Sequence, residues 1–131
     1  MIHYDMHLGL SDLEDTVRKT VSALDPHCGE FDSIVTEGIS GLTVAAPVAL
    51  VLRKPLVIVR KTTTGLCWHA SEVEGSKHAG RRALFIDDHV DFGRTLRHVR
   101  DQLARHAPSC RIAGIYTYQD NTLEFVQPRF Q

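Results

Sequence analysis

Two neighbouring carboxylates, Asp87 and Asp88, follow a run of apolar residues, and Gly93 and Thr95 come a few positions later. The apolar run 83–86 predicts a buried strand and the segment after the loop predicts a helix, so the polar residues lie between the two. Unpaired N–H groups at a helix start favour an anion, and a glycine lets the backbone approach a ligand closely. Carboxylates beside them can accept hydrogen bonds from a diol. The combination suits a ribose 5-phosphate.

The same residues also have a purely structural interpretation. Asp87 can cap the end of the strand, and Asp91 can cap the helix that follows. We favour the functional interpretation because the acids, the glycine and the threonine occur together at fixed offsets between one strand and one helix.

Strands and helices alternate along the chain around this loop. The predicted strands are 33–36, 56–59, 83–86 and 111–118, and the predicted helices are 11–24, 42–52 and 94–106. This alternation is typical of an α/β fold with a mainly parallel sheet and helices on both faces. Ligands of such sheets bind outside the carboxyl ends of the strands. Those ends carry residues 37–41, 60–61 and 87–95, so three polar segments are expected to meet at one edge.

Local signals set the limits of the helices. Ser11 and Glu14 have the spacing of a capping box, which predicts the start of the first helix, and Asp25-Pro26 predicts its end. The helix 42–52 is apolar on nearly every side, which predicts that it is buried.

Two remaining segments are expected to lack regular structure. Residues 60–81 form a long connection, within which 66–73 can form a short strand, and residues 119–131 form a tail. A connection of this length inside a small domain is usually functional or mobile.

The composition is that of one ordinary globular domain, residues 1–131. Hydrophobic residues make up 43% and charged residues 24%, which argues against a disordered chain. Fifteen basic and sixteen acidic residues exclude a strongly basic nucleic-acid binder. The first residues have no signal-peptide pattern, and the longest apolar run, 44–52, is too short to span a bilayer. We expect a cytoplasmic protein that binds neither nucleic acid nor a membrane.

Cysteine and histidine show no metal-binding pattern. Cys28, Cys67 and Cys110 are scattered and form no CxxC pair, so reduced thiols are expected. His3 and His7 have the spacing of two ligands on one helix face, but no third ligand is evident. We therefore expect no metal bound by protein ligands.

A family resemblance is carried by three stretches of the sequence. Residues 83–96, ALFIDDHVDFGRTL, resemble the phosphoribosyl-pyrophosphate signature of type I phosphoribosyltransferases. Residues 38–50 and then 54–61 resemble adenine phosphoribosyltransferases in particular. The resemblance implies a single-domain α/β fold of this type with a parallel sheet and helices on both faces. It also implies a reduced hood, because only residues 1–9 and 119–131 are obviously available to cover a nucleobase.

The resemblance implies an activity, the transfer of 5-phosphoribose from phosphoribosyl pyrophosphate to a purine nitrogen with release of pyrophosphate. Asp87 and Asp88 would bind the ribose hydroxyls, and Asp91 would be the third catalytic residue. The 5-phosphate would be held by Asp91, Phe92, Gly93, Arg94 and Thr95, and the pyrophosphate by Gly38, Ile39, Ser40 and Gly41 with the basic pair Arg60 and Lys61.

The resemblance further implies how the substrates arrive and are enclosed. Mg²⁺ would be carried by phosphoribosyl pyrophosphate, so the aspartates need not ligate it directly. The segment 62–80 would close over the reaction and exclude water. A homodimer is expected by resemblance, and the apolar helix 42–52 is compatible with it.

Three residues depart from the family pattern. Phe92 stands where the family usually has threonine or another small residue, which removes one hydroxyl from the phosphate site. Ser40 replaces the basic residue common in the adenine group, and His89 replaces an apolar residue.

These departures leave alternatives open. Asp91 resembles an aspartate of the 6-oxopurine enzymes that can exchange a proton with the purine N7, so a 6-oxopurine or orotate remains an alternative to adenine. The second alternative is a non-catalytic, phosphoribosyltransferase-like domain that binds a nucleotide or phosphoribosyl pyrophosphate as a regulatory signal.

Overall fold

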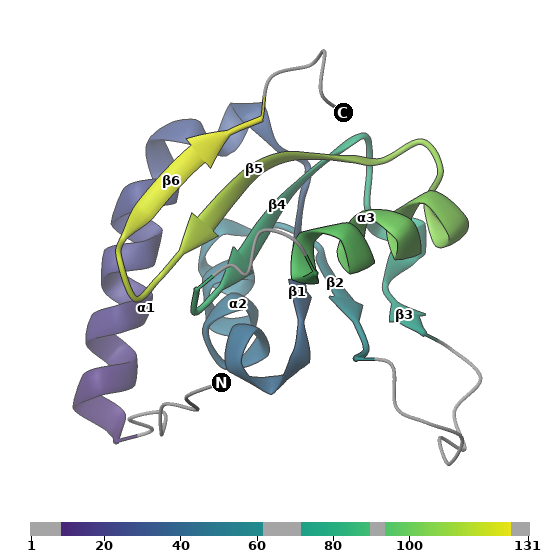
Figure 1. Ribbon diagram of the computed structural model, residues 1–131. Helices are drawn as coiled ribbons and strands as arrows, with labels where there is room; N and C mark the ends of the chain where they lie inside the picture. Colours follow the sequence, from purple (N-terminus) through teal and green to yellow (C-terminus); the bar gives the residue numbers. More distant parts are fainter. Residues whose placement is uncertain (1–8, 62–71, 90–93, 127–131) are drawn as a thin grey trace.

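Six strands form one sheet with helices on both of its faces in the computed structural model, which describes residues 9–61, 72–89 and 94–126 (Figure 1). The strands are β1 (Ser33–Glu37), β2 (Leu56–Val59), β3 (Val73–Glu74), β4 (Arg82–Asp87), β5 (Arg111–Thr117) and β6 (Thr122–Phe125). The helices are α1 (Leu10–Leu24), α2 (Gly38–Leu52) and α3 (Thr95–His106), with short 3₁₀ turns η1 (Asp25–Glu30) and η2 (Ser76–His78).

The sheet has the strand order β3-β2-β1-β4-β5-β6. The four inner strands are parallel, while β3 and β6 pair antiparallel at the two edges. The predicted α/β class, the mainly parallel sheet and the helices on both faces are thereby confirmed. Predicted and observed limits of the inner strands agree to within one residue at every end, which is the usual uncertainty of such boundaries.

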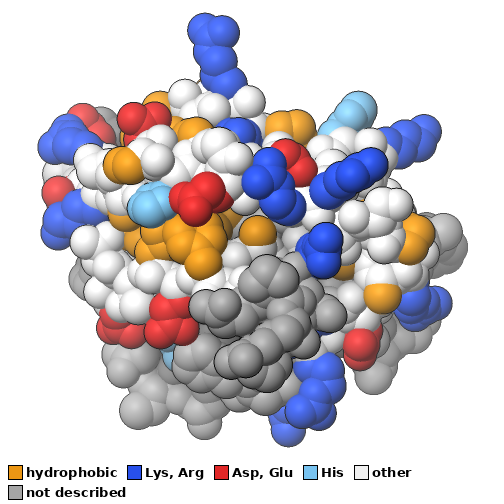
Figure 2. Space-filling view, turned by 90° about the horizontal axis from the view of Figure 1, so that it is seen from above, with side chains coloured by type: hydrophobic (Ala, Val, Ile, Leu, Met, Phe, Trp, Pro, Cys, Tyr) orange, Lys and Arg blue, Asp and Glu red, His pale blue; other side chains and the backbone are white. Residues whose placement is uncertain are grey.

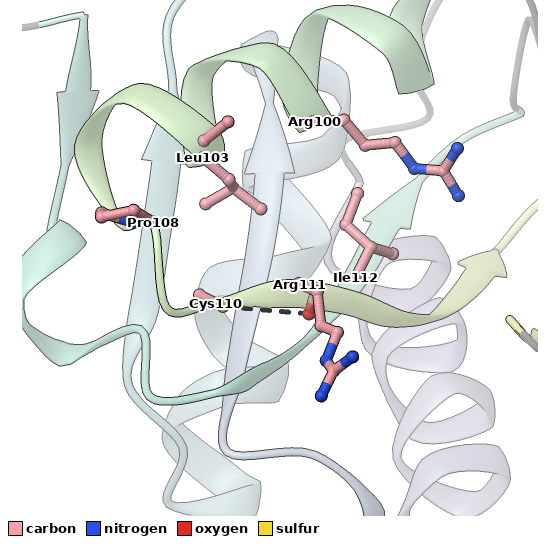
Figure 3. Close-up of a pocket in the computed structure, with 7 residues that line it drawn as sticks. Arg100, Leu103, Pro108, Cys110, Arg111 and Ile112 are labelled. Atoms are coloured by element: carbon pink, nitrogen blue, oxygen red, sulfur yellow. Dashed lines mark hydrogen bonds between the residues drawn. The ribbon is translucent and has the colours of Figure 1, made fainter. Parts of the chain in front are cut away.

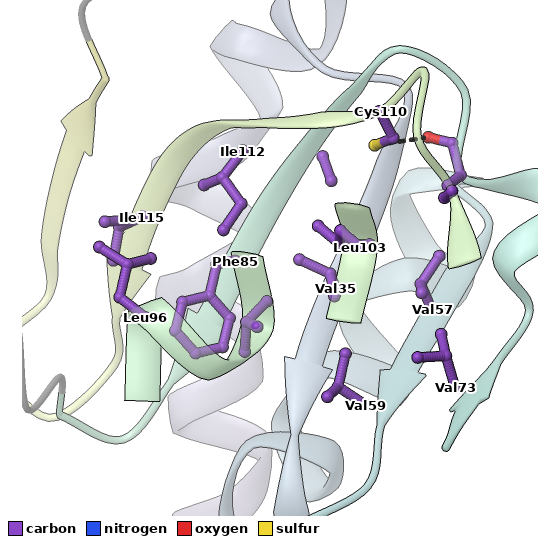
Figure 4. Packing of buried hydrophobic residues seen from close by; sticks show 14 residues of the cluster. Val35, Val57, Val59, Val73, Phe85, Leu96, Leu103, Cys110, Ile112 and Ile115 are labelled. Atoms are coloured by element: carbon purple, nitrogen blue, oxygen red, sulfur yellow. Dashed lines mark hydrogen bonds between the residues drawn. The ribbon is translucent and has the colours of Figure 1, made fainter. Parts of the chain in front are cut away.

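The central strand β1 is buried along its whole length because both faces of the sheet are covered. Alternate residues of a strand point to opposite faces. Ile34 therefore packs beneath α1 and α2. Val35 and Phe85 pack on the opposite face, in one cluster with Leu103 of α3 (Figure 4). These two apolar layers fix the ends of β1 and β4, where the polar residues begin.

The cap of the first helix lies two residues earlier than its capping-box pattern predicts. The Gly9 carbonyl oxygen accepts a hydrogen bond from the Leu13 N–H at 3.0 Å, so Gly9 is the N-cap and Ser11 lies inside the first turn. The predicted cap is therefore wrong. The predicted end is confirmed, because α1 stops at Leu24 and Pro26 begins a 3₁₀ turn.

The second helix differs from its prediction in both extent and burial. It begins at Gly38 directly after β1, so residues 38–41, which precede the predicted helix 42–52, form its first turn. It packs on the sheet and on α1 through one side only, as in Val44 and Val48, and the other side exposes 78% of Ile39 and 80% of Leu50. The expectation of an entirely buried helix is wrong, since no described element covers the outer face.

The C-terminal region and the long connection are more ordered than predicted. The Asp120–Asn121 turn, with Asn121 at a φ of 51°, joins β5 to β6 and replaces the first part of the predicted tail. Asparagine tolerates this left-handed conformation better than most residues. In the connection, residues from Val73 onward pair with β2 or pack on the sheet, so they do not belong to a free covering segment. Residues 66–71 of the predicted short strand lie outside the described residues.

None of the helices in the described ranges is both long enough and apolar enough to cross a membrane.

Gly41 has no room for a side chain. A Cβ atom there would overlap the Thr36 hydroxyl oxygen and lie 3.0 Å from the Ile86 carbonyl oxygen, which that hydroxyl now hydrogen-bonds. Gly41→Ala should lower the free energy of unfolding by about 1–3 kcal/mol, measured by urea denaturation. The matched control is Gly29→Ala, because nothing lies within 4 Å of its added Cβ. Equal stability of the two variants would contradict this packing.

Candidate active site

The carboxyl ends of β1, β2 and β4 lie at one edge of the sheet, beside the start of α3 (Figure 1). This edge brings together most of the residues predicted for the site. Gly38–Gly41 form the first turn of α2, Arg60 and Lys61 follow β2, Asp87 ends β4, and Thr95 begins α3. Asp91, Phe92 and Gly93 lie outside the described residues.

Hydrogen bonds from the neighbouring strand fix the two aspartates. The backbone N–H groups of Tyr118 and Gln119 donate to the carbonyl oxygens of Asp87 and Asp88, at 3.0 and 3.2 Å. The Asp87 carboxylate also accepts the Asp88 N–H at 2.8 Å, and the Asp88 carboxylate accepts the His89 N–H at 2.8 Å. The acid pair is therefore held by its own backbone turn and by the end of β5.

The two carboxylates differ in their surroundings. Asp87 is 6% exposed, whereas 22% of the Asp88 side chain is exposed. The pKa of Asp87 is raised to about 8. Burial is the largest cause, and the nearby Asp88 and Glu37 carboxyl groups raise the pKa as well. Asp87 is consequently protonated over part of the neutral pH range, while Asp88 faces the solvent side of the edge.

A third acid, Glu37, was given no role by the sequence analysis. Val35 and Phe85 point to the same face of the sheet, so Glu37 and Asp87, two residues further along adjacent strands, also point toward α3. The Glu37 side chain is 7% exposed, and its Oε2 has no hydrogen-bond partner among the described residues. Burial raises the pKa of Glu37, against the opposing effect of His98 and Lys61. One sequence signal could have identified Glu37 as a site residue. It is an acid that directly follows a predicted strand and directly precedes a glycine.

His98 links α3 to the ends of β1 and β2. Its Nε2 lies 3.2 Å from the Arg60 carbonyl oxygen and 3.7 Å from Glu37 Oε2. Because a carbonyl oxygen only accepts, the proton of this contact resides on Nε2. His98 was not predicted as a site residue, although it stands one turn after Thr95 on the same helix face.

Arg60 and Lys61, the basic pair that follows β2, have different neighbours. The Arg60 guanidinium forms an ion pair with Glu74 at 3.2 Å, which directs it to the β3 edge. The Lys61 stem lies against Gly38, where an added Cβ would come within 2.8 Å of the lysine Cε. Gly38 also has a φ of 72°, so this position requires glycine for conformation and for space.

The first turn of α2 is anchored from β5. The Tyr118 hydroxyl donates to the Ser40 carbonyl oxygen at 3.0 Å, and burial together with the two aspartates raises the pKa of Tyr118. The N–H groups of the first turns of α2 and α3 lack helical partners and therefore favour anions. The edge thus presents two anion-binding helix ends with acidic side chains between them.

The described residues contain no cluster of three or more histidine, cysteine or acidic side chains that could hold a metal ion. Cys28 and Cys110 are free thiols, and Cys67, His3 and His7 lie outside the described ranges.

This topology is the fold of the type I phosphoribosyltransferases. The chain is similar to orotate phosphoribosyltransferase from Aeropyrum pernix, at 22% identity and a TM-score of 0.65, over 88% of this chain and 64% of that one. It is also similar to adenine phosphoribosyltransferase from Thermoanaerobacter pseudethanolicus (18% identity, TM-score 0.61, 83% and 68%). A third similar structure is purine phosphoribosyltransferase from Pyrococcus horikoshii (19%, 0.58, 84% and 73%).

These similarities confirm the fold that the sequence resemblance implied. No protein-family model and no curated protein sequence matches the chain. The chain spans 64% of the Aeropyrum pernix structure and 51% of a similar orotate phosphoribosyltransferase from Francisella tularensis. Identities of this size show that the chain and these enzymes share a fold.

The buried position of Asp87 generates a prediction about pH. The pKa of this group rises from 3.8 to about 8 on folding, so the folded protein binds the proton more tightly than the unfolded chain. The stability linked to Asp87 is fully present below pH 4 and is lost as the pH rises to about 8. Asp87→Asn should therefore stabilise the fold at pH 8, by roughly 1–3 kcal/mol, and should have little effect at pH 4.

Thermal unfolding of both proteins from pH 4 to pH 8.5 measures this difference. Asp101→Asn, which changes an exposed carboxylate on α3, is the matched control and should show no such trend. A stability difference between Asp87→Asn and the parent protein that is independent of pH would contradict the assignment.

Proposed function

We propose that the protein is a phosphoribosyltransferase that transfers 5-phosphoribose from phosphoribosyl pyrophosphate to an adenine-like purine and releases pyrophosphate. The observation that carries this proposal is the position of Asp87 and Asp88, which lie between the first turns of α2 and α3 in a type I phosphoribosyltransferase fold. A substrate with a diol between two phosphate groups matches two acids between two anion-binding helix ends.

Each end of the substrate has its own group of residues in this proposal. Arg94 and Thr95 at the start of α3, with the preceding residues 91–93, hold the 5-phosphate. The first turn of α2, Gly38–Gly41, holds the pyrophosphate, and Lys61 supplies a positive charge next to it. Mg²⁺ enters as part of the substrate, bound to its pyrophosphate and ribose oxygens.

The acids stabilise the charge that develops during the transfer. The bond between the ribose anomeric carbon and pyrophosphate breaks while a base nitrogen forms a new bond to that carbon, so the ribose ring becomes transiently positive. Asp88 faces the open side of the edge and supplies the carboxylate in this proposal, while the buried Asp87 accepts the Asp88 N–H and holds its backbone in place. Fixed carboxylates stabilise such a transition state without reorganising.

A second candidate function rests on the state of the basic residues. Arg60 is engaged by Glu74, and Ser40 offers no positive charge to the pyrophosphate site. A weakened pyrophosphate site favours a regulatory domain that binds phosphoribosyl pyrophosphate or a nucleotide without turning it over.

Calorimetric titration with phosphoribosyl pyrophosphate and Mg²⁺, followed by a base panel with pyrophosphate detection, tests both candidates. The panel contains adenine, hypoxanthine, guanine, xanthine and orotate. We expect binding and turnover with adenine. Asp88→Asn should retain the thermal midpoint of the parent protein and lose at least about 100-fold in turnover. Binding without turnover of any base would favour the regulatory candidate. Failure to bind phosphoribosyl pyrophosphate would mean that the chain shares only its fold with the phosphoribosyltransferases.

We further propose a homodimer formed through the outer face of α2. No charged residue occurs between Gly38 and Leu52, and the exposed side chains of Ile39 and Leu50 lie three helical turns apart on one face. An apolar face of this kind is suited to burial against a symmetric copy of itself.

Leu50→Lys should convert the dimer to a monomer. Burial of a leucine contributes about 1.5–3 kcal/mol and a two-fold interface contains the residue twice, so the dissociation constant should rise at least about 100-fold. Light scattering during size-exclusion chromatography measures the change. Ser22→Lys, at an exposed position of α1, should leave the mass unchanged. A monomeric parent protein would refute the dimer and leave the proposed activity standing.

A further inference from the structure

His98 is a polar side chain of α3 that is directed at the edge where the candidate active site lies. Its Nε2 reaches the Arg60 carbonyl oxygen after β2 and the Glu37 carboxylate at the end of β1. The basic side chains of the molecule lie differently. Arg100, on the rim of the apolar cavity beneath the second half of α3, points away from the helix (Figure 3), and many Lys and Arg side chains project outward from the surface seen from above (Figure 2). His98 is thus placed to act on the site, whereas Arg100 faces the solvent.

The backbone of Arg60 is held from two sides. Its N–H group donates to the Glu72 carbonyl oxygen at 2.9 Å, on the side of β3. Its carbonyl oxygen lies 3.2 Å from His98 Nε2, on the side of α3. The guanidinium group adds an ion pair with Glu74. The direction in which the chain continues from β2 into Lys61 is therefore set by α3 as well as by β3.

Lys61 owes its place beside α2 to this backbone. Its side chain lies along Gly38, the first residue of α2, where an added Cβ would come within 2.8 Å of the lysine Cε and 3.5 Å of its Nζ. The ammonium group is consequently next to the first turn of that helix. A lysine side chain has many rotamers, so it delivers its charge to one point at low entropic cost only when its backbone is fixed.

Glu37 keeps the imidazole of His98 turned toward the edge. Its Oε2 is buried and has no hydrogen-bond partner among the described residues. This oxygen lies 3.7 Å from His98 Nε2, so the carboxylate attracts the Nε2–H group without replacing the carbonyl of Arg60 as its nearer acceptor. The imidazole is thereby held between one acceptor from β1 and one from the residue that follows β2.

We infer that His98 is a positioning residue for the pyrophosphate group of the substrate, an inference that rests on the proposed function. Through the Arg60 carbonyl it holds Lys61 beside the first turn of α2, where the pyrophosphate binds in that proposal. His98 also stands one turn after Thr95, at the helix end proposed for the 5-phosphate, so it fixes the separation of the two anion sites. The site then favours a ribose that carries both anionic groups over ribose 5-phosphate.

Calorimetric titration of the full chain with three ligands tests this role. The ligands are phosphoribosyl pyrophosphate and inorganic pyrophosphate, each with Mg²⁺, and ribose 5-phosphate. His98→Leu should weaken binding of the first two about 10-fold, as expected for one lost hydrogen bond, and should leave the affinity for ribose 5-phosphate unchanged. His78→Leu makes the same exchange at an exposed histidine of η2, near the amino end of β2, and should bind all three ligands as the parent protein does.

Two further variants separate positioning from a general change in α3. His98→Gln retains an N–H donor at about the place of Nε2 and should restore most of the lost affinity. In Lys61→Met, which already lacks the ammonium group, the additional exchange His98→Leu should cause little further loss, because His98 acts through Lys61. Losses that add in the double variant would contradict an action through Lys61.

A measurement without ligand keeps this inference distinct from the proposed function. The hydrogen bond from His98 polarises the peptide group between Arg60 and Lys61, so the Lys61 amide nitrogen should shift in the ¹⁵N NMR spectrum of His98→Leu and stay near its parent position in His98→Gln. An unmoved Lys61 resonance, or an equal loss of affinity for ribose 5-phosphate, would overturn the role of His98 and leave the proposed transferase standing. Failure of the parent protein to bind any of the three ligands would refute the proposed function and this inference with it.

Discussion

Burial of β1 and β4 on both faces is the constraint on which the candidate site depends. Their apolar residues fix the two strands side by side between α3 and the α1–α2 layer. The last positions of the two strands hold Glu37 and Asp87, which enter a poorly solvated space because the strands have not yet left the core. The unusual protonation of the edge is thus a consequence of the packing that places it.

The helices that flank this edge receive their positions from the same strands. Since α2 starts directly after β1, its first turn lies next to the acid at the strand end. The third helix is tied back by His98, whose contacts reach the ends of both β1 and β2. The amino-terminal ends of α2 and α3 are therefore coupled through side chains and not only through the sheet.

The sequence allowed the inner strands, α3 and the edge that carries the site to be predicted, because continuous apolar runs and a polar strand–loop–helix motif are local signals. It did not reveal which acids are buried, since Glu37 owes its environment to an adjacent strand far along the chain. The exposure of Leu50 depends equally on the absence of a covering element, which an apolar pattern alone does not encode. The hairpin of β5 and β6 was missed because its short, exposed second strand has a weak pattern.

The bonds that β5 makes to the acid pair have a consequence for how the protein is synthesised. Asp87 and Asp88 leave the ribosome well before Tyr118 and Gln119, whose backbone N–H groups hold their carbonyl oxygens in place. Tyr118 also supplies the hydroxyl that anchors the first turn of α2. A nascent chain that ends before this strand contains the acidic residues without the bonds that fix their backbone. The backbone geometry of this edge is accordingly acquired late in translation, when the end of β5 docks beside β4.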